Sequence, residues 1–460
     1  ALWVCTQCQK TIPANAKPLC DCGGEARLKE IRGSTPASRF LVLELAERLP
    51  FEPRILGYLR LDPPIPRMHR RTPEGVERDI RERIFPRDWF HPTYEGGADW
   101  QKALDRVNTA AARIARVVVH PDYRSEGFGA LLVRVALEWA KERGAPEARR
   151  EKHLVYTIAQ MARYHPFFEK VGFRYLFDTA SGRPVLFYPL TEEAEAHLER
   201  FLREDPYAKA HGGRLYKPRF GRVPGLPGPI RLAGVHKAYR SHLDLEGLSR
   251  EVQEALLAFG VKARVVERAV LRGASLEIPP GSLVVLAGAS GAGKTTLLRL
   301  LLGEAPDAGE VAVPPGRRVA YIPGEREVDL GEAPILEAVY RRLKDVGAAI
   351  EVLNRVGLSD AVLYRARPHE LSTGQRERFR LALLLAERPD LLLIDEFAAH
   401  LDVPTARRVA LGLGKLCREA GVTLVAATHR PEVVAALDPD LLVYVGYGGL
   451  TTVPRRGPRT

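Results

Sequence analysis

Short apolar runs, separated by glycine, proline and polar residues, recur along most of this 460-residue chain. From Phe40 onward, stretches typical of strands alternate with stretches typical of helices. The runs at 283–287 and 391–394 are apolar at every position, which is the pattern of a buried strand. The alternation predicts a multidomain α/β protein.

A glycine-rich loop follows the apolar run at 283–287, and the apolar stretch after the loop reads as the opening of a helix. A phosphate-binding loop requires this strand–loop–helix context. Its glycines let backbone N–H groups converge on phosphates, Lys294 adds positive charge at the β and γ oxygens, and the Thr295 hydroxyl can ligate Mg²⁺. The expected nucleotide-binding residues are Gly288, Ala289, Ser290, Gly291, Ala292, Gly293, Lys294, Thr295 and Thr296.

Four more segments follow this loop in order, at 371–375, 391–396, 399–402 and 427–429. Together with the loop they resemble the ABC-type ATPases, over about half the chain. The resemblance implies ATP hydrolysis, in which Asp395 supports Mg²⁺, Glu396 polarises the attacking water and His429 senses the γ-phosphate. It also implies a head-to-tail homodimer, because the signature loop contacts the ATP held by a second copy. The residues that it adds to the ATP site are Asp395, Ser372, Gly374, Gln375 and Asp402.

The chain departs from the ABC pattern in two places. After the strand at 319–323 the family has a glutamine, whereas this chain has Gly324 and Glu325. The stretch 262–271, where the adenine-stacking aromatic residue is expected, contains no aromatic residue. The stretch 230–239 looks like the family's first strand, ending in Tyr239, and a helical insertion is expected at about 243–259. Tyr239 is therefore the expected partner of adenine.

A second turn with glycines follows the strand at 113–119 and opens a helix, so backbone N–H groups again point at an anion. This stretch resembles the acyl-CoA pyrophosphate site of GNAT acyltransferases, and 167–173 looks like that family's closing helix, turn and strand. A Rossmann-like helix start that binds no phosphate is the alternative. The resemblance implies acetyl-CoA binding by Val117, Val119, Arg124, Ser125, Glu126, Gly127, Phe128, Gly129 and Ala130.

The strand at 113–119 also suggests the acceptor. Its Arg-x-x-Arg, apolar triplet and His-Pro are similar to the tRNA and rRNA cytidine acetyltransferases, which implies a nucleobase amine. Attack of an amine on a thioester needs oxyanion donors, a base, and an acid for the departing thiolate. The tyrosine that supplies this acid in many GNAT enzymes is Phe168 here. Tyr164, on the same face if the stretch is helical, is the expected substitute, and an amphipathic core tyrosine is the alternative.

Four of the five cysteines form two close pairs near the N-terminus, whereas Cys417 lies alone in a helical stretch and is expected to fill the core. Two such pairs suit tetrahedral Zn²⁺, and disulfides are the competing interpretation. The expected zinc ligands, which would hold a small ribbon together, are Cys5, Cys8, Cys20 and Cys22.

The net charge of +12 favours a polyanionic partner, RNA or DNA. No apolar run approaches the roughly 18 residues of a membrane span, and no signal peptide opens the sequence, so we expect a cytoplasmic protein. The expected domains are a zinc ribbon at 1–32, a GNAT domain at 33–203, a basic linker rich in proline and glycine at 204–229, and an ABC ATPase at 230–460. The linker reads either as a solvated tether or as a strip that binds nucleic acid.

Three alternatives to a nucleic-acid acetyltransferase stay open. The chain could be an ABC transport or assembly subunit with a regulatory GNAT-like module. The acetyl acceptor could be an amine of a protein or of a small molecule. Both nucleotide pockets could also be sensors without turnover.

Overall fold

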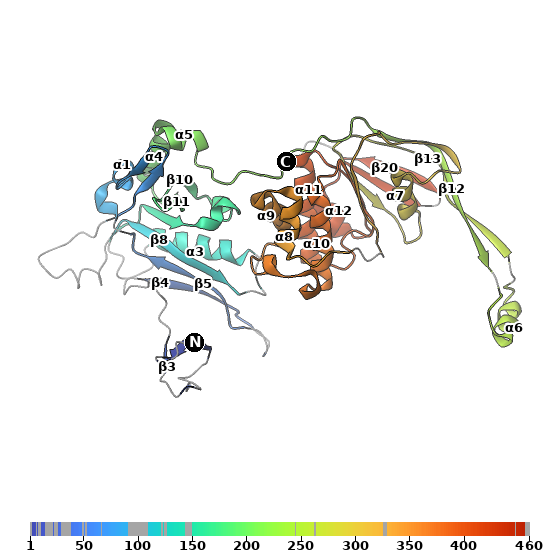
Figure 1. Ribbon diagram of the computed structural model, residues 1–460, viewed down its shortest axis with the longest axis horizontal. Helices are drawn as coiled ribbons and strands as arrows, with labels where there is room; N and C mark the ends of the chain where they lie inside the picture. Colours follow the sequence, from blue (N-terminus) through green and yellow to red (C-terminus); the bar gives the residue numbers. More distant parts are fainter. Residues whose placement is uncertain are drawn as a thin grey trace, which may run out of the picture. The chain divides into compact units, whose positions relative to one another are not determined.

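The chain folds into two compact units, Ala1–Tyr216 and Lys217–Thr460, which Figure 1 draws in colours that follow the sequence. The structure is a computed structural model. It describes residues 2–5, 7, 11–13, 22, 26–28, 38–47, 50, 53–65, 67–90, 109–120, 123, 127–142, 150–243, 245–261, 264–324, 329–446 and 448–455.

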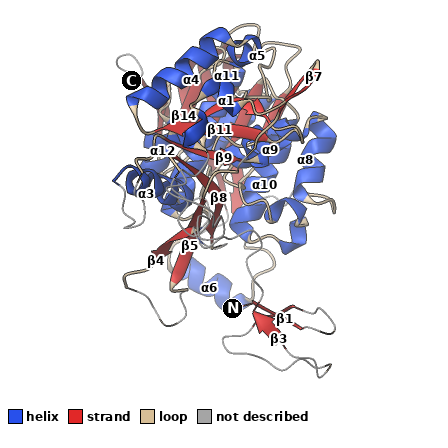
Figure 2. Cartoon of the chain, turned by 90° about the vertical axis from the view of Figure 1, so that its left-hand side faces the viewer, coloured by secondary structure: helices blue, strands red, loops and turns tan. Residues whose placement is uncertain are grey.

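The N-terminal segment forms a small antiparallel sheet of β1 (Leu2–Cys5), β2 (Thr11–Pro13) and β3 (Ala26–Leu28), in the order β2-β1-β3. Figure 2 shows β1 and β3 beside the N-terminus. The register places Cys5, the last residue of β1, opposite Ala26. A small strand unit therefore carries Cys5, the first of the four paired cysteines, at the end of its central strand.

The first unit is built on a six-stranded sheet in the order β10-β11-β9-β8-β5-β4. Its neighbouring strands are antiparallel except for β8 and β9, which are parallel and paired from Ala111 to Ile114. The strands are β4 (Arg39–Glu44), β5 (Ile55–Asp62), β8 (Ala111–Val119), β9 (Leu154–Ile158), β10 (Arg174–Asp178) and β11 (Pro184–Pro189).

Side chains alternate across this sheet and fill a separate core on each face. One face packs Leu59, Leu61 and Ile114 against α3 (Phe128–Glu142). The other face packs Tyr156 and Phe187 against α1 (Arg81–Ile84), η1 (Arg87–Trp89) and α4 (Glu192–Glu204). The short elements η3 (Gln160–Arg163) and η4 (Glu169–Val171) lie between β9 and β10.

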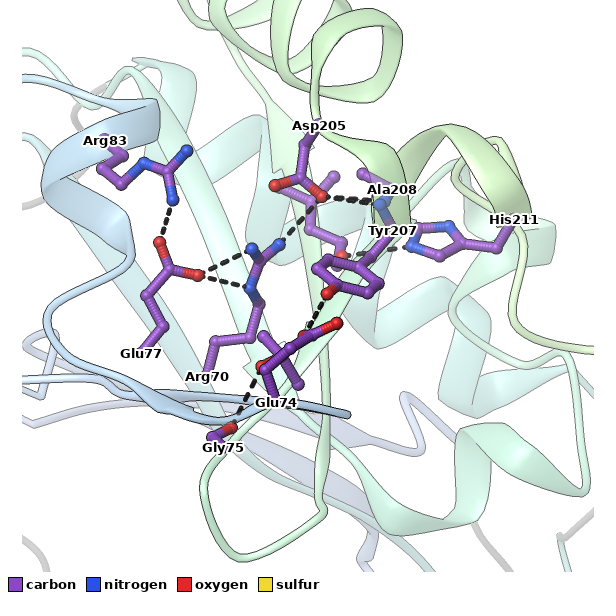
Figure 3. A network of polar contacts seen from close by, with 11 residues as sticks. Arg70, Glu74, Gly75, Glu77, Arg83, Asp205, Tyr207, Ala208 and His211 are labelled. Atoms are coloured by element: carbon purple, nitrogen blue, oxygen red, sulfur yellow. Dashed lines mark hydrogen bonds and ion pairs between the residues drawn. The ribbon is translucent and has the colours of Figure 1, made fainter.

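A buried ion-pair network ties the hairpin of β6 (Arg70–Thr72) and β7 (Gly75–Glu77) to α5 (Pro206–His211), as Figure 3 shows. Arg70 Nη1 lies 2.9 Å from Asp205 Oδ1, and Arg70 Nε donates to Glu77 Oε2 at 2.9 Å. The same Asp205 oxygen accepts from the amide of Ala208 at 2.9 Å and so caps α5. The first part of the expected linker is thus helical and packed on the first unit.

The next part of the expected linker belongs to the second unit. Phe220 is 1 % exposed, and Glu351 Oε2 accepts hydrogen bonds from the amides of Arg219 and Phe220 at 2.6 and 3.1 Å. Arg388 donates to the carbonyl oxygens of Phe220 and Arg222. This segment is therefore packed on the second unit through a buried side chain and hydrogen-bonded backbone groups, and it is not the solvated tether that its composition suggested.

The second unit contains two sheets. A three-stranded antiparallel sheet has the order β13-β12-β15, and a six-stranded sheet has the order β16-β17-β18-β14-β19-β20, with parallel pairing from β16 to β19. The strands are β12 (Ile230–Leu243), β13 (Arg264–Ile278), β14 (Leu283–Ala287), β15 (Ala308–Ala312), β16 (Val319–Ile322), β17 (Leu391–Ile394), β18 (Thr423–Ala427), β19 (Leu441–Gly446) and β20 (Gly449–Pro454).

Helices enclose the parallel strands, and every residue of β17 and β18 is buried, which explains their continuous apolar sequence. Cys417 is fully buried in this core, as expected, and burial raises the pKa of its thiol to about 12. The helical elements are α7 (Lys294–Leu302), α8 (Ile335–Leu343), α9 (Val346–Arg355), η5 (Leu363–Arg365), η6 (Pro368–Glu370), α10 (Thr373–Ala386), α11 (Val403–Ala420) and α12 (Pro431–Leu437).

The insertion between β12 and β13 contains α6 (Arg250–Ala258), so a helix is present there as expected. The two strands stay paired as far as Leu243 and Arg264, and Figure 1 shows α6 beyond their far end. Within the part of the chain that the structure describes, no helix is long and apolar enough to cross a membrane.

Candidate functional site

Four segments predicted to act on nucleotide leave the six-stranded sheet at the same edge. Parallel pairing places Leu286 of β14 beside Ala427 of β18, and Ile394 of β17 beside Ile322 of β16. The phosphate loop, the pair Asp395 and Glu396, His429 and Gly324 follow these strand ends. The carboxyl edge of a parallel sheet is where ligands bind in open α/β folds.

The phosphate loop needs glycine at both of its ends. Gly288 has φ +151°, and a Cβ there would lie 2.2 Å from the carbonyl oxygen of Val445. Gly293 has φ +112°, and a Cβ there would lie 2.6 Å from a methyl carbon of Val270. Any side chain at either position would displace β19 or β13, so the loop keeps its path and its amides beside the start of α7.

Lys294 and Thr295 are the first two residues of α7 and follow the phosphate loop directly. Lys294 Nζ donates to the carbonyl oxygens of Gly288 and Ala289, each at 2.8 Å. Thr295 Oγ1 donates to Asp395 Oδ2 at 2.7 Å, across 100 positions of sequence. A hydroxyl and a buried carboxylate held this close are the oxygen ligands that Mg²⁺ prefers, so these residues fit the expected cation.

Glu396 stands next to this pair in a strained backbone conformation, with φ +49°. Its amide donates to Asp395 Oδ1 at 3.1 Å, and a Cβ on Gly324 would lie 3.0 Å from Glu396 Oε2. The glycine that replaces the family's glutamine therefore leaves room for the Glu396 carboxylate. Glu325 lies outside the described residues.

His429 is exposed, as is Ser372 in the signature loop, whereas Gly374 and Gln375 are half-buried. Thr428, the residue before His429, donates from Oγ1 to the carbonyl oxygen of Phe397, which positions the histidine beside the Asp395–Glu396 turn. Ser372 and Gln375 form a capping box at the start of α10, and a Cβ on Gly374 would lie 3.1 Å from Leu401. Asp402 Oδ1 caps α11 by accepting from the amide of Thr405 at 2.9 Å.

Tyr239 lies half-buried on β12, where its hydroxyl donates to Glu304 Oε1 at 3.2 Å. Its partner across the ladder is Arg268, whose Nη2 donates to the carbonyl oxygen of Gly291 in the phosphate loop at 2.8 Å. Arg268 is a site residue that sequence reasoning missed. The sequence held one signal for Arg268: it lies within 262–271, the stretch in which the family's adenine-stacking residue is expected.

In the first unit, β8 and α3 form the predicted acyl-CoA site. The pairing of β8 with β9 ends at Ile114, whereas its pairing with β5 extends to Val119. β8 and β9 therefore separate where Val117 and Val119 lie. Gly127 has φ +88°, and a Cβ on Gly129 would lie 3.0 Å from the Phe167 ring. The glycine-bearing turn and the stretch 167–173, which are the two parts of the GNAT resemblance, therefore come together at Gly129. Arg124, Ser125 and Glu126 lie outside the described residues, whereas Phe128 and Ala130 begin α3.

Tyr164 does not share a helix face with Phe168. It ends η3, whereas Phe168 precedes η4, and the turn at His165 and Pro166 separates them. The premise of one continuous helix is wrong, because the proline interrupts it. Sequence reasoning also missed the neighbouring His165, whose pKa burial lowers to about 4 and whose Nδ1 has no hydrogen-bond partner within the described residues.

The predicted zinc ligands are placed in part. Cys5 ends β1 and Cys22 lies exposed in a turn, whereas Cys8 and Cys20 fall outside the described residues. Among the residues that are described, no group of three or more histidine, cysteine or acidic side chains could hold a metal ion. The zinc ribbon stays a prediction.

Comparison with known proteins supports both halves of this description. The sequence pattern of the ABC transporter family matches residues 271–399, and that of the acetyltransferase (GNAT) domain matches residues 95–175. The zinc import ATP-binding protein ZnuC of Ruegeria pomeroyi is 34 % identical over 198 residues, which cover 42 % of this chain and 75 % of the relative. The chain belongs to the ABC ATP-binding protein family.

Other members of the ABC family are similar to this chain. The methionine import ATP-binding protein MetN of Mesorhizobium japonicum is 34 % identical over 40 % of this chain and 56 % of its own length. The lipoprotein-releasing system ATP-binding protein LolD 1 of Rhodospirillum rubrum is 35 % identical over 37 % of this chain and 84 % of its own length. A solved dimeric bacterial ABC transporter cassette covers 50 % of the chain at 22 % identity and a TM-score of 0.37.

This ABC protein also contains a GNAT acetyltransferase domain. Both domain types indicate enzymatic activity.

Proposed function

We propose that this chain hydrolyses ATP and uses that reaction to control the transfer of an acetyl group from acetyl-CoA to an amine of a nucleobase in RNA or DNA. The observation that carries the proposal is the presence, in one chain, of the Thr295–Asp395 pair beside the phosphate loop and of the Gly129–Phe167 contact beside α3. The net charge of +12 and the resemblance to cytidine acetyltransferases support a nucleic-acid acceptor.

In the ATPase half, Lys294 and the loop amides would hold the phosphates, and Thr295 with Asp395 would hold Mg²⁺, which would supply positive charge to the phosphates. Glu396 lies where its carboxylate can orient a water toward the γ-phosphate. The lack of a side chain at Gly324 leaves room for that carboxylate.

In the acetyltransferase half, the nucleobase nitrogen attacks the thioester carbon, forming the C–N bond as the C–S bond breaks. The amine proton passes to a base and the CoA thiolate takes up a proton. The opening between β8 and β9 beyond Ile114 supports placement of the thioester there, because backbone groups at that position can hydrogen-bond the carbonyl oxygen as negative charge develops.

The ATPase half further supports a head-to-tail homodimer. Ser372, which is exposed, caps α10, and Gly374 lies in its first turn, where they could contact ATP bound to a second copy. Gel filtration of Glu396→Gln tests this arrangement, because the variant should bind ATP without turnover. We expect a dimer with Mg-ATP and a monomer without nucleotide, and a monomer under both conditions would refute the arrangement.

We also propose that Cys5, Cys8, Cys20 and Cys22 hold a structural Zn²⁺. The position of Cys5 at the end of the central strand of a small sheet supports this. Elemental analysis of the purified chain should give one zinc per chain, reduced in Cys5→Ser. Absence of zinc from the wild type would refute the site.

The relatives favour one second candidate, a transport or assembly ATPase with a GNAT regulatory domain, since their names describe import and lipoprotein release. The two candidates differ in their partners. Co-purification of the chain with an integral membrane protein would favour the transport role. Incorporation of labelled acetyl groups into nucleosides, lost in Gly127→Glu, would favour the acetyltransferase role.

A further inference from the structure

Among the described residues, no helix packs against part of one face of the sheet in the first unit. Leu41, Leu59 and Val117 point into the core beneath α3, so alternation places Phe40, Arg60 and Arg116 on the opposite face. Across β9 and β11 that opposite face is covered by α1, η1 and α4. Across β4, β5 and β8 it carries exposed side chains.

The strand register arranges these side chains in two adjacent rows. Val42, Tyr58 and Val118 form one row, and Phe40, Arg60 and Arg116 form the next. Phe40, Val42 and Val118 are 44 %, 48 % and 36 % exposed, and the rings of Phe40 and Tyr58 lie 6.2 Å apart. We define these six residues as the open sheet face.

Positive charge on the open sheet face exceeds negative charge. Asp62, the next residue of β5 on that side, is shared by two arginines: Arg60 Nε lies 3.1 Å and Arg113 Nη2 lies 2.9 Å from its carboxylate oxygens. Arg116 is exposed and has no ion-pair partner among the described residues. One carboxylate against three guanidinium groups leaves the face basic.

One of these arginines is both buried and incompletely bonded. Arg60 is 5 % exposed; its Nε is paired with Asp62, and its Nη1 makes no hydrogen bond to any described residue. Arg60 lies opposite the exposed Arg116 in the strand ladder, so it adds positive charge beside that residue.

We propose that the open sheet face binds single-stranded nucleic acid, with a base stacked on Phe40 and Tyr58 and a phosphate bound by the exposed Arg116. This inference rests on the proposed function and names the acceptor as a polynucleotide rather than a free nucleoside. Aromatic side chains on a sheet stack unpaired bases, and arginines beside them bind the backbone. An acidic protein would satisfy the charge but would not require the exposed Phe40 ring beside Tyr58.

The location fits the proposed reaction. Val118 of the open sheet face lies between Val117 and Val119 on the strand predicted to bind the thioester. A strand bound there would therefore bring its bases to the edge of the acetyl-transfer site.

Fluorescence anisotropy with a labelled single-stranded RNA oligonucleotide tests the surface. Phe40→Ala should weaken binding on the order of tenfold to a hundredfold, and Phe40→Tyr should restore it, because stacking on an aromatic ring is lost and regained. Arg116→Ala should lower the slope of log Kd against log salt by roughly 0.7, as expected for one lost phosphate contact on a single strand.

Arg134→Ala and Val135→Ala are matched controls, because both side chains are exposed on α3, across the sheet from the open face. Both should bind RNA as the wild type does. Oligonucleotide affinity unchanged in Phe40→Ala and in Arg116→Ala would overturn the proposal and leave the face to a protein partner.

Labelled acetyl transfer separates this inference from the proposed function. If these variants bind and acetylate RNA normally, the function stands and the surface is wrong. If the wild type binds RNA through this face but acetylates none, the surface stands and the proposed reaction is wrong.

Discussion

Replacement of Phe220 by alanine should destabilise the second unit strongly. The Phe220 ring is 1 % exposed in the main core of that unit, and the Arg388 guanidinium lies 5.1 Å from its centroid. Loss of a fully buried phenylalanine costs about 3–5 kcal/mol, and the cation–π contact adds about 0.5–1 kcal/mol.

A loss of about 4 kcal/mol corresponds to a fall in Tm of roughly 8–16 °C for a domain of this size. The full chain should be heated in a differential scanning calorimeter with and without Mg-ATP. The transition that Mg-ATP raises belongs to the second unit, because a ligand stabilises the state that binds it.

Phe259→Ala is the matched control, because Phe259 is 87 % exposed beside the end of α6. Removal of an exposed ring should change stability by less than about 0.5 kcal/mol. If Phe220→Ala lowers the Tm no more than Phe259→Ala does, the segment after Lys217 is a tether, and its packing against Glu351 and Arg388 does not stabilise the unit.

Four further outcomes are expected. Lys294→Ala should abolish ATP hydrolysis and leave the circular dichroism spectrum unchanged; wild-type turnover would overturn the assignment of the loop. Gly127→Glu should prevent CoA binding in calorimetry, because bulk and negative charge would stand beside the pyrophosphate. Burial lowers the pKa of His165 from 6.5 to about 4, so its contribution to stability is present above pH 6.5 and is lost as the pH falls toward 4; His165→Gln should flatten the urea-unfolding free energy over that range. Cys417 should resist a thiol reagent at pH 8 until the chain unfolds, since burial raises its pKa to about 12.

The chemistry of the nucleotide site was largely readable from the sequence, because its motifs are local. The loop Gly288 to Thr295 needs its own geometry, and continuous apolar residues predict the strands that end at Ala287 and Ile394. Parallel pairing then brings their ends together without further information. Similar local signals indicated the turn at Gly127 and Gly129.

Contacts between distant residues were not readable. In the sequence Gly324 is only a departure from the family's glutamine, whereas the structure shows that a side chain there would approach the Glu396 carboxylate. Phe220 and Glu351 are 131 positions apart, so composition could not show that the segment between the units is packed. The prediction that Tyr164 shares a helix face with Phe168 was wrong for a local reason, because Pro166 interrupts the helix that it assumed.

The measurement that tests the central claim most directly is the fate of a labelled acetyl group. The wild-type chain, Gly127→Glu and Lys294→Ala should each be incubated with labelled acetyl-CoA, Mg-ATP and cellular RNA or DNA, and the nucleosides separated after digestion. We predict label in one nucleoside fraction with the wild type, none with Gly127→Glu and less with Lys294→Ala. Label that enters protein alone, or that enters nucleosides equally with all three chains, would contradict the account.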